Sequence, residues 1–346
     1  MYDVITIGTA TRDVFLKSRY FKEFRNENLK DIGIFGGVAE CFVWGGKIEV
    51  EKPVLTSGGG ATNAAVTFAR QGYKTASIFK IGDDRPGEGI VQDLKKEGVT
   101  TLAMKDKKFG TGYSTLLLAD TGERTVLVYR GAANNLELKE IPKGKLNCRW
   151  AYIVPGNIDF KVMENMVSAL HKNGARIAID LSSHYLSMGR KKLEPILKKL
   201  TLVKGNREEI GLLMGMDSID EQKLFYEFNR SIGGIAVMSD GPRGVLVSDG
   251  VYLYKAGTYK EKQVADRTGA GDAFGSGFVA GLMRNAKSYK LKAASWAPAD
   301  IEYAIRLGSA NATSVVEYVG AKEGILTKKQ FNSNRWGKLS IERKKL

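Results

Sequence analysis

The sequence predicts an α/β fold built on a mostly parallel sheet, with helices on both faces and a small β-sheet lid. Three observations lead to this prediction. The 346 residues, 43% of them hydrophobic, are enough to bury the core of one large domain. Short β-rich runs alternate with helical patterns along most of the chain, as in parallel sheets whose strands are linked by helices. Two β-rich segments interrupt this alternation.

The alternating elements can be assigned in chain order. The first strand is expected at residues 3–8, and the first helix is expected at residues 61–71 because Gly72 just after it is a common helix stop. Further strands are expected at residues 74–81, 152–154, 176–180, 201–203 and 235–239, and further helices at residues 87–97, 160–172 and 207–214.

Two segments depart from this alternation and are expected to form the lid. Residues 11–56 have no clear strand–helix order, and residues 111–130 read as two strands joined by a turn at residues 120–122. A small sheet made from both segments could cover a cleft. Since we find no linker and no internal repeat, we expect one domain at residues 1–330 with lid excursions at about 12–56 and 109–130, followed by a basic C-terminal tail at residues 331–346.

Composition and charge exclude several classes of protein. Two cysteines, Cys41 and Cys148, cannot build a disulfide framework, and we find neither a signal peptide nor an apolar run of membrane-spanning length. We therefore expect a cytoplasmic protein with no membrane partner. The net charge of +15 is concentrated at residues 190–204 and 327–346. Neither stretch interleaves aromatic residues as a single-strand binding surface does, so we interpret them as a solvated helix face and a loose tail and regard nucleic acid as an unlikely partner.

The most informative stretch is DRTGAGDAFGSGF, at residues 266–278. Phe274, Phe278 and Leu282 recur at helical spacing, which places the small residues at a helix start, where free backbone N–H groups attract an anion. Asp272 would lie in the first helical turn. It is either an acid that stabilises the helix dipole or a base that takes the proton of a hydroxyl attacking a phosphoryl group. The motif alone leaves both interpretations open.

Several other kinds of site are absent from the sequence. The Gly-Lys pairs lack the following Ser or Thr of a P-loop, and the first strand ends without three spaced glycines of a dinucleotide-binding pattern. His171 and His184 are the only histidines, and neither stands near a nucleophile-elbow sequence or in a metal-ligand spacing. The helix start at residues 266–278 is therefore the principal candidate site.

The run DRTGAGDAF resembles the C-terminal signature of the ribokinase-like (PfkB) carbohydrate kinase family. SGGGATNAA at residues 57–65 resembles the first signature of that family. NREE at residues 206–209, SDGPRGV at residues 239–245 and VGAKEGI at residues 319–325 resemble three further elements in the family's order. The resemblance spans about residues 2–325, and it implies a Rossmann-like three-layer α/β/α sandwich with a small β-sheet lid.

The resemblance also implies roles for single residues on the acceptor side. Asp272 is expected to be the general base, next to an anion hole of backbone N–H groups. Without the resemblance, we would interpret Asp13 as an ordinary loop acid, Gly58 and Gly59 as a tight turn before a helix, and Asn63 as a buried polar side chain. The implied anion hole comprises Gly269, Ala270 and Gly271, and the implied sugar contacts are Asp13, Gly58, Gly59 and Asn63.

Nucleotide and metal contacts are implied in the same way. Magnesium would be held near the phosphates of ATP, mainly through water, although NREE alone is more often a helix-capping pattern. A monovalent-cation loop is implied as well, but Arg267 replaces a residue that is often Thr or Pro in the family, which leaves potassium activation open. The implied residues are Asn206, Ser239, Gly241, Gly244, Gly271 and Asn311 for the nucleotide, Asn206 and Glu209 for Mg²⁺, and Asp266 and Thr268 for K⁺.

The acceptor itself is not defined by the sequence. Gly156 stands where ribokinase proper has an acid that helps select its sugar, and the insertion at residues 17–44 carries Phe35, Phe42 and Trp44. We interpret these aromatic residues as lid core, with stacking on a nucleobase or a sugar face as the alternative.

We therefore expect ATP-dependent phosphorylation of a primary hydroxyl, with simple sugars ranked above nucleosides and phosphorylated sugars third. The alternative function is a non-catalytic sugar or nucleotide sensor on the same fold. A homodimer formed through the lid is a plausible assembly, because exposed lid edges often pair in the family.

Overall fold

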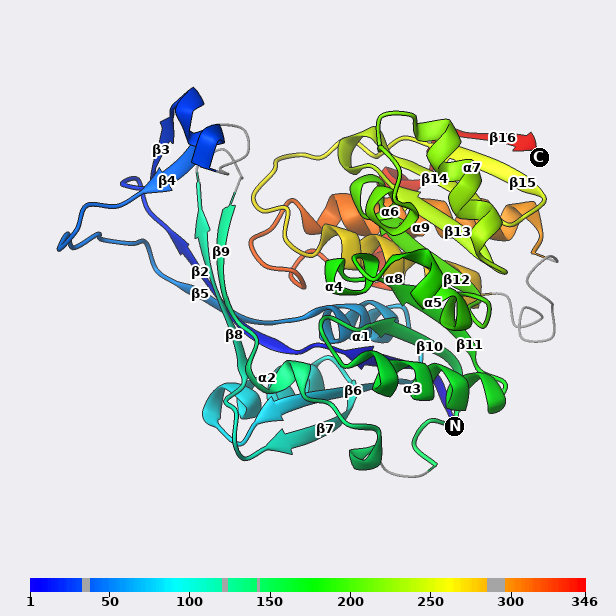
Figure 1. The fold of residues 1–346 in the computed structure, drawn as a ribbon, viewed down its shortest axis with the longest axis horizontal. Coiled ribbons are helices and arrows are strands. Elements are labelled where there is room, and N and C mark those ends of the chain that lie inside the picture. Colours follow the sequence, from blue (N-terminus) through cyan, green and yellow to red (C-terminus); the bar gives the residue numbers. More distant parts are fainter. Residues whose placement is uncertain (33–37, 120–123, 142–143, 285–295) are drawn as a thin grey trace.

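The chain folds around one large sheet, which the computed structural model describes over residues 1–32, 38–119, 124–141, 144–284 and 296–346 (Figure 1). Neighbouring strands are parallel on the side of the sheet that includes the N-terminal strand. At the opposite edge, three pairs of neighbouring strands are antiparallel. In spatial order the strands are β16 (Ile341–Lys345), β15 (Tyr252–Ala256), β14 (Val245–Ser248), β13 (Ile235–Ser239), β12 (Leu202–Asn206), β11 (Arg176–Asp180), β10 (Cys148–Val154), β1 (Tyr2–Gly8), β6 (Thr75–Gly82) and β7 (Thr100–Asp106).

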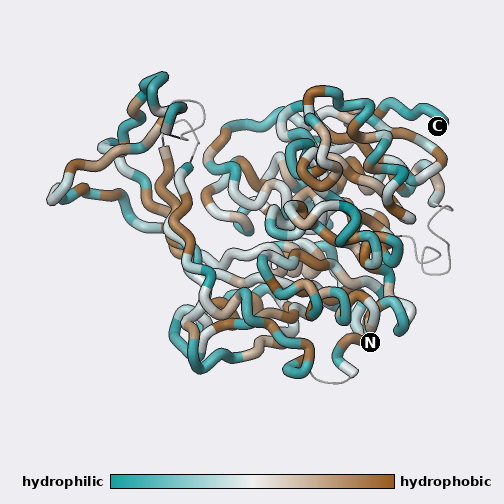
Figure 2. Tube along the Cα trace, viewed as in Figure 1, coloured by the Kyte–Doolittle hydropathy of each residue, from teal (hydrophilic) through white to brown (hydrophobic). Residues whose placement is uncertain are grey.

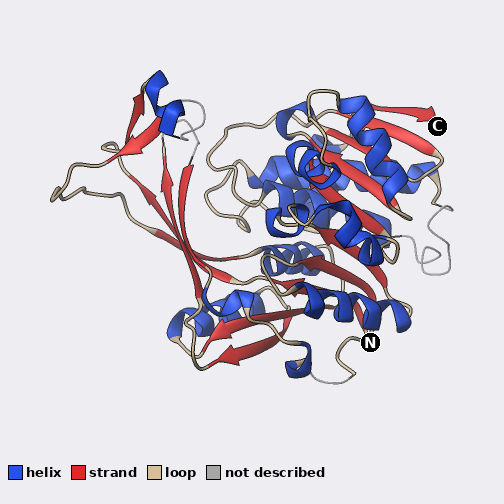
Figure 3. Ribbon diagram, in the orientation of Figure 1, coloured by secondary structure: helices blue, strands red, loops and turns tan. Residues whose placement is uncertain are grey.

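Helices cover both faces of this sheet, which confirms the predicted three-layer sandwich (Figure 3). Neighbouring residues of β1 point to opposite faces, so that Val4 packs in one core and Ile5 in the other. No helix in the described ranges is long and apolar enough to cross a membrane. One face carries α3 (Phe160–Lys172), α4 (Ser183–Leu186), α5 (Gly189–Leu197), α6 (Arg207–Met214) and α7 (Glu221–Ser231), and the other carries α1 (Gly60–Arg70), α2 (Arg85–Lys96), α8 (Ala270–Met283), α9 (Pro298–Val315) and α10 (Lys328–Phe331).

Local sequence signals account for several helix ends. Asp84 caps α2 by accepting a hydrogen bond from the backbone N–H of Gly87, and Asp159 caps α3 in the same way. Gly72, the expected stop after the first helix, lies just beyond α1 with φ of 88°. Such a left-handed conformation is open to glycine without strain. The hydrophobic runs lie along the central strands, as hydropathy colouring shows (Figure 2).

Helices α8 and α9 pack against each other through small residues. Every residue of α8 from Ala273 to Met283 is buried. A Cβ on Gly281 would lie 2.6 Å from the Cα of Ala304 on α9, and a Cβ on Gly277 would lie 3.1 Å from the Cα of Gly308. The glycines therefore allow the two backbones to approach closely, and α8 is held in the interior between the sheet, α1 and α9.

A separate small sheet projects from the main sheet, as predicted for the lid (Figure 1). Its strand order is β5 (Val54–Gly58), β2 (Thr11–Lys17), β8 (Gly112–Leu118) and β9 (Arg124–Tyr129), with β2 and β8 parallel. The predicted turn at residues 120–122 lies outside the described residues. Two further strands, β3 (Lys22–Arg25) and β4 (Val38–Cys41), pair within the insertion.

The expectation that the aromatic residues of the insertion form lid core is wrong for the two that the structure describes. Phe42 is 46% exposed and Trp44 is fully exposed, although the ring of Phe42 meets that of Phe21 edge to face at 5.7 Å. Neither Phe42 nor Trp44 lines the pocket described below. Phe35 lies outside the described residues.

The basic C-terminal segment is not a loose tail, contrary to our expectation. Residues 341–345 form β16, which pairs antiparallel with β15 and completes one edge of the main sheet. Phe331 and Trp336, earlier in the same segment, are buried against the core of the α8–α9 face. Charged side chains do not prevent this pairing, because the backbone makes the ladder while the side chains of an edge strand remain in solvent.

Candidate active site

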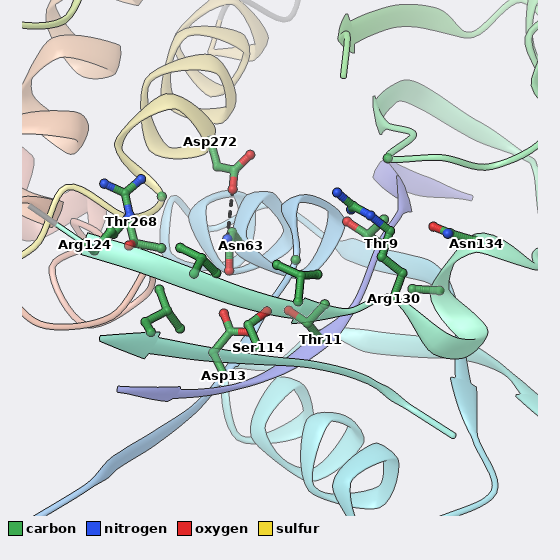
Figure 4. A pocket seen from close by; sticks show the side chains of 17 residues that line it. Thr9, Thr11, Asp13, Asn63, Ser114, Arg124, Arg130, Asn134, Thr268 and Asp272 are labelled. Carbon is green, nitrogen blue, oxygen red and sulfur yellow. Dashed lines mark hydrogen bonds between the residues drawn. The ribbon is translucent and has the colours of Figure 1, made fainter. Parts of the chain in front are cut away.

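A pocket of about 270 Å³ lies between the lid and the C-terminal ends of the central strands (Figure 4). Six residues predicted from distant parts of the sequence line it together: Asp13, Gly59, Asn63, Thr268, Gly269 and Asp272. The fold brings them together because the C-terminal ends of parallel strands meet at one edge of a sheet. Asp13 comes from lid strand β2, Asn63 from α1 and Asp272 from α8, so the lid and two helices of one face meet in one cavity.

The start of α8 has the geometry of an anion site. Gly269 precedes the helix with φ of 79°, and no side chain caps the first turn. A Cβ on Gly269 would overlap Ala321, so glycine is required here for both conformation and space. The first N–H groups of a helix have no intrahelical partner, and the helix dipole places partial positive charge at the same point. Ala270 and Gly271 thus present their backbone to the pocket end of the helix.

Asp272 lies in the first turn of α8 and is linked to two residues of other segments. Its Oδ2 accepts a hydrogen bond of 2.8 Å from Nδ2 of Asn63. Oδ1 of the same Asn63 accepts a hydrogen bond of 2.7 Å from Nζ of Lys322. Asn63 therefore orients the Asp272 carboxylate. The amide group has a second N–H donor and lines the pocket, so the expected contact of Asn63 with the sugar stays a prediction. In the described part of the chain, Oδ1 of Asp272 forms no hydrogen bond.

Lys322 is a buried ammonium group beneath this pair. Its Nζ also donates to the backbone carbonyl of Ser57 and, at 2.9 Å, to the hydroxyl of Thr62. Burial lowers the pKa of Lys322 to about 8, although the negative charges of Asp13 and Asp272 act in the opposite direction. Three acceptors match the three N–H donors of the ammonium group, which fixes its position under α1.

Asp13 is a buried carboxylate that faces the pocket from β2. Burial raises the pKa of Asp13, while hydrogen bonds from the side chains of Thr11 and Ser114 oppose that rise. Its Oδ1 is buried and has no hydrogen-bond partner among the described residues. Gly58 has no room for a side chain, because a Cβ there would overlap the Asp13 carboxylate. Gly59 adopts φ of 90° directly before α1. Asp13 can therefore accept a hydrogen bond from a bound hydroxyl.

Asn206 and Glu209 form a capping box at the start of α6. Oδ1 of Asn206 accepts from the backbone N–H of Glu209 at 2.9 Å, and Oε2 of Glu209 accepts from the backbone N–H of Asn206 at 2.7 Å. Nearby, Nζ of Lys204 pairs with Oδ2 of Asp180 at 2.7 Å. Burial acts to lower the pKa of Lys204, but the negative charges of Asp180 and Glu209 outweigh it and raise that pKa.

The ammonium group of Lys204 also lies beside the anion site, since a Cβ on Gly271 would be 3.1 Å from its Nζ. A positive charge at this position favours a phosphate at the start of α8.

The remaining predicted nucleotide residues have different environments. Ser239 ends β13, and Gly241 and Gly244 bound the short 3₁₀ turn that follows, with φ of 51° and 100°. Asn311 is fully buried on α9, where its amide donates to the carbonyl of Ala273 and accepts from the N–H of Leu326. This gives Asn311 a structural role between α8 and α9 in place of the nucleotide contact that we expected of its side chain.

Asp266 and Thr268 organise the loop before α8. Asp266 is fully buried, and its Oδ1 accepts hydrogen bonds from both the N–H and the hydroxyl of Thr268. Its Oδ2 accepts from the N–H of Gly320 at 3.1 Å. Both carboxylate oxygens thus already have protein donors, so the geometry accounts for these residues as a loop support without a bound cation.

Comparison with known proteins identifies the family. The model of the pfkB family of carbohydrate kinases matches residues 38–328.

The chain belongs to the pfkB family.

Relatives of this pfkB-family protein include a sugar kinase of Archaeoglobus fulgidus of uncharacterised specificity, 28% identical over 75% of this chain and 97% of the relative. A 5-dehydro-2-deoxygluconokinase of Clostridium perfringens is 27% identical over 88% of this chain and 92% of the relative. The structure of Arabidopsis thaliana ribokinase complexed with ribose and ATP superposes with a TM-score of 0.73 at 18% identity, over 95% of this chain and 97% of that one. The ribokinase-like fold and membership of a sugar and nucleoside kinase family are therefore established.

Four residues of this pfkB-family site were missed by sequence reasoning. Lys322 lies within the VGAKEGI run, but nothing in that segment indicates a buried ammonium group. Arg124, Arg130 and Asn134 line the pocket from the lid and from the 3₁₀ turn Gly131–Asn134. Oδ1 of Asn134 is buried without a partner among the described residues. A buried oxygen without a partner indicates a ligand contact, and only the folded structure shows such an oxygen.

Proposed function

We propose that the protein transfers the γ-phosphoryl group of ATP to a primary hydroxyl of a sugar or a nucleoside, with Asp272 as the general base. The observation that carries this proposal is the position of Asp272 in the first turn of α8, beside the N–H groups of Gly269–Gly271 and in the same pocket as Asp13. An anion site and a carboxylate base are the two components that this transfer requires of the protein.

Proton and phosphoryl transfer follow from this arrangement. Asp13 binds hydroxyl groups of the acceptor and orients it, and Asn63 holds Oδ2 of Asp272 so that Oδ1 faces the acceptor hydroxyl. As the hydroxyl oxygen bonds to the γ-phosphorus, its proton passes to Asp272, and the bond from that phosphorus to the β–γ bridging oxygen breaks to release ADP. The helix N–H groups and the ammonium of Lys204 stabilise the negative charge of the group in transit.

Magnesium and ATP fit the residues around this site. Within the described ranges no cluster of His, Cys, Asp and Glu could hold a metal ion by itself. This agrees with Mg²⁺ bound mainly by phosphate oxygens and water, with Asn206 and Glu209 contacting its water shell. Mg²⁺ neutralises phosphate charge in such reactions. We propose that Ser239, Gly241 and Gly244 lie along the nucleotide, which follows from their place on the turn after β13.

Substitution of Asp272 by Asn tests the proposal. With Mg-ATP and a panel of pentoses, hexoses, ketodeoxy sugar acids and nucleosides, Asp272→Asn is expected to lower kcat by about 10²–10⁴-fold, because the proton acceptor is removed. Calorimetry should show that ATP and acceptor still bind. Glu323→Gln, which changes an exposed acid next to Lys322, is the matched control and should retain kcat. Near-normal turnover by Asp272→Asn would exclude Asp272 as the base.

The alternative function is a non-catalytic sensor of sugars or nucleotides. A sensor would bind sugar or ATP tightly in calorimetry and release no ADP with any member of the panel. The Asp272–Asn63–Lys322 chain favours the kinase, because binding alone requires no carboxylate aimed at the anion site.

We also propose that two copies pair through their lids. Val126 and Val128 of β9 line the pocket, so Leu127 and Tyr129 point to the opposite face, where they are 57% and 52% exposed. Leu55 of β5 is 57% exposed as well. Burial of such an apolar surface favours association. Sedimentation equilibrium should give the mass of a dimer, and Leu127→Glu should give that of a monomer.

A further inference from the structure

Two arginines stand at the ends of lid strand β9, and both line the pocket. Arg124 is the first residue of the strand, and Arg130 follows directly after its last. Figure 4 shows them at opposite ends of the cavity, with Arg124 next to Thr268 and Arg130 on the side of Thr9 and Asn134. Within the described residues neither guanidinium group has a hydrogen bond or an ion pair. Each is therefore available to a ligand.

The two ends of the pocket differ in what they already contain. Arg124 lies toward the start of α8, where the phosphoryl group of ATP is expected. The positive charge of Arg124 can therefore pair with this phosphoryl group in the proposed reaction. Arg130 lies at the other end, where Thr9, Thr11 and Asn134 contribute neutral polar groups. The carboxylates that line the pocket, Asp13 and Asp272, belong to its middle part in this view. Because Arg130 lies at the end of the pocket away from the nucleotide, the phosphoryl group of ATP does not explain its positive charge there.

The lining also limits the kind of molecule that fits. The lining combines Thr, Ser, Asn, Asp and Arg side chains with Leu, Val, Ala and Gly, and none of the described residues that line the pocket is aromatic. A nucleobase is commonly bound by stacking on an aromatic ring, whereas hydroxyl groups need acceptors such as the unpartnered Oδ1 atoms of Asp13 and Asn134. A pocket of about 270 Å³ holds a small polyhydroxylated molecule.

We propose that the acceptor is a sugar derivative with a carboxylate or a phosphate, and that Arg130 binds this anionic group at the end of the pocket remote from the N-terminus of α8. This inference rests on the proposed function, since it specifies the acceptor of the same reaction. Guanidinium binds both anions through paired N–H donors. Asn134, next to the anion, accepts a hydrogen bond from an adjacent hydroxyl group of the acceptor. The hydroxyl at the opposite end of the molecule then faces Asp272.

The test compares acceptors that share a carbon skeleton and differ in whether one end carries an anionic group. The panel pairs each sugar acid with its alcohol, such as gluconate with glucitol, and each sugar phosphate with its free sugar, such as fructose 6-phosphate with fructose. For each pair the ratio of kcat/KM, anionic over neutral, is measured by ADP release with the wild type, Arg130→Gln and Arg124→Gln. Thermal melting of the three proteins verifies that they are folded.

We expect a wild-type ratio of at least about 10 in one of the two arms, because a hydrogen bond to a charged group contributes about a factor of 10–100. The arm that shows it identifies the anion as carboxylate or phosphate. Arg130→Gln should bring the ratio close to 1, mainly through KM, and Arg124→Gln, at the other end of the same strand, should leave it unchanged. A ratio near 1 in both arms, or a ratio unaffected by Arg130→Gln, overturns the inference.

The result also separates this inference from the proposed function. Equal turnover of neutral and anionic acceptors supports the kinase and refutes the anionic acceptor. If no acceptor releases ADP, the same pairs are titrated by calorimetry in the presence of a non-hydrolysable ATP analogue. Preferential binding of the anionic member, lost in Arg130→Gln, then supports the anion site although the kinase proposal fails, and equal binding refutes the anion site.

Discussion

The buried ammonium group of Lys322 gives a prediction with a calculable magnitude. Its pKa is lowered from 10.5 to about 8, chiefly by burial. The folded protein therefore releases this proton at lower pH than the unfolded chain does. At about 1.36 kcal/mol per pH unit, keeping the charge in the interior costs about 3 kcal/mol of folding free energy below pH 8. That cost is relieved as the pH rises from about 8 toward 10.5, because in this window the unfolded chain binds more protons.

Lys322→Met removes the charge and retains the length of the side chain. We expect the free energy of unfolding of the wild type to rise relative to this variant by about 2 kcal/mol between about pH 7.5 and 9.5. Urea unfolding followed by tryptophan fluorescence at each pH measures the difference. Lys172→Met, at an exposed lysine in the last turn of α3, is the control and should show no such trend. If the difference in free energy of unfolding between the wild type and Lys322→Met does not change with pH, the lowered pKa of Lys322 is refuted.

The same variant tests how the base is oriented. Without the ammonium group, Oδ1 of Asn63 loses its donor, so the amide is free to turn and to present an oxygen to Asp272. We expect kcat to fall by up to about 100-fold, as for other displacements of reacting groups, with little change in KM. A variant that is folded and fully active would show that Lys322 does not position Asp272 through Asn63.

Four further predictions follow from particular contacts. Asn206→Ala should cost about 1 kcal/mol of stability through the lost cap of α6 and should raise the Mg²⁺ concentration needed for half-maximal activity; unchanged urea unfolding would exclude the cap. Gly269→Ala should cost roughly 1–3 kcal/mol, because alanine is strained at φ of 79° and overlaps Ala321; a wild-type midpoint of unfolding would contradict this. Deletion of residues 341–346 should expose the edge of β15 and increase light scattering on heating, whereas behaviour like the full chain would show that β16 is dispensable. Potassium activation also stays a prediction: kcat in K⁺ should exceed kcat in Na⁺ at equal ionic strength if the loop at Asp266 holds this ion, and equal rates would exclude it.

The fold could be predicted where local pattern and burial agree. The helix at residues 160–172 and the strand at residues 176–180 have the expected bounds, because a capping Asp159, an amphipathic run and a short apolar strand are all local signals. β16 could not be found in this way. Its sequence, IERKK, carries four charges in five residues, and its pairing depends on the free edge of β15, which only the tertiary structure supplies.

The site residues could be predicted from the sequence where glycine and acidic residues occur together at a fixed spacing. Asp13, Asn63 and Asp272 do converge on one pocket, but the sequence did not indicate that Asn63 would be engaged by Asp272 and Lys322. A lysine beside a glutamate in a glycine-containing loop is read as a surface residue, and the burial of Lys322 results from contacts with segments about 260 residues away. Arg130 was equally hidden, since the direction of an arginine in a β-rich segment depends on the register of the lid.

Because α8 is buried from Ala273 onward while β9 lies open to solvent, the two halves of the pocket should respond differently to heat. Amides of α8 beyond its first turn should exchange with deuterium only through global opening of the protein, whereas those of β9 should exchange through small local fluctuations. On warming, the lid should therefore loosen before the helix that carries Asp272 does. We therefore expect selectivity among acceptors to decline at temperatures at which the enzyme still transfers phosphoryl groups.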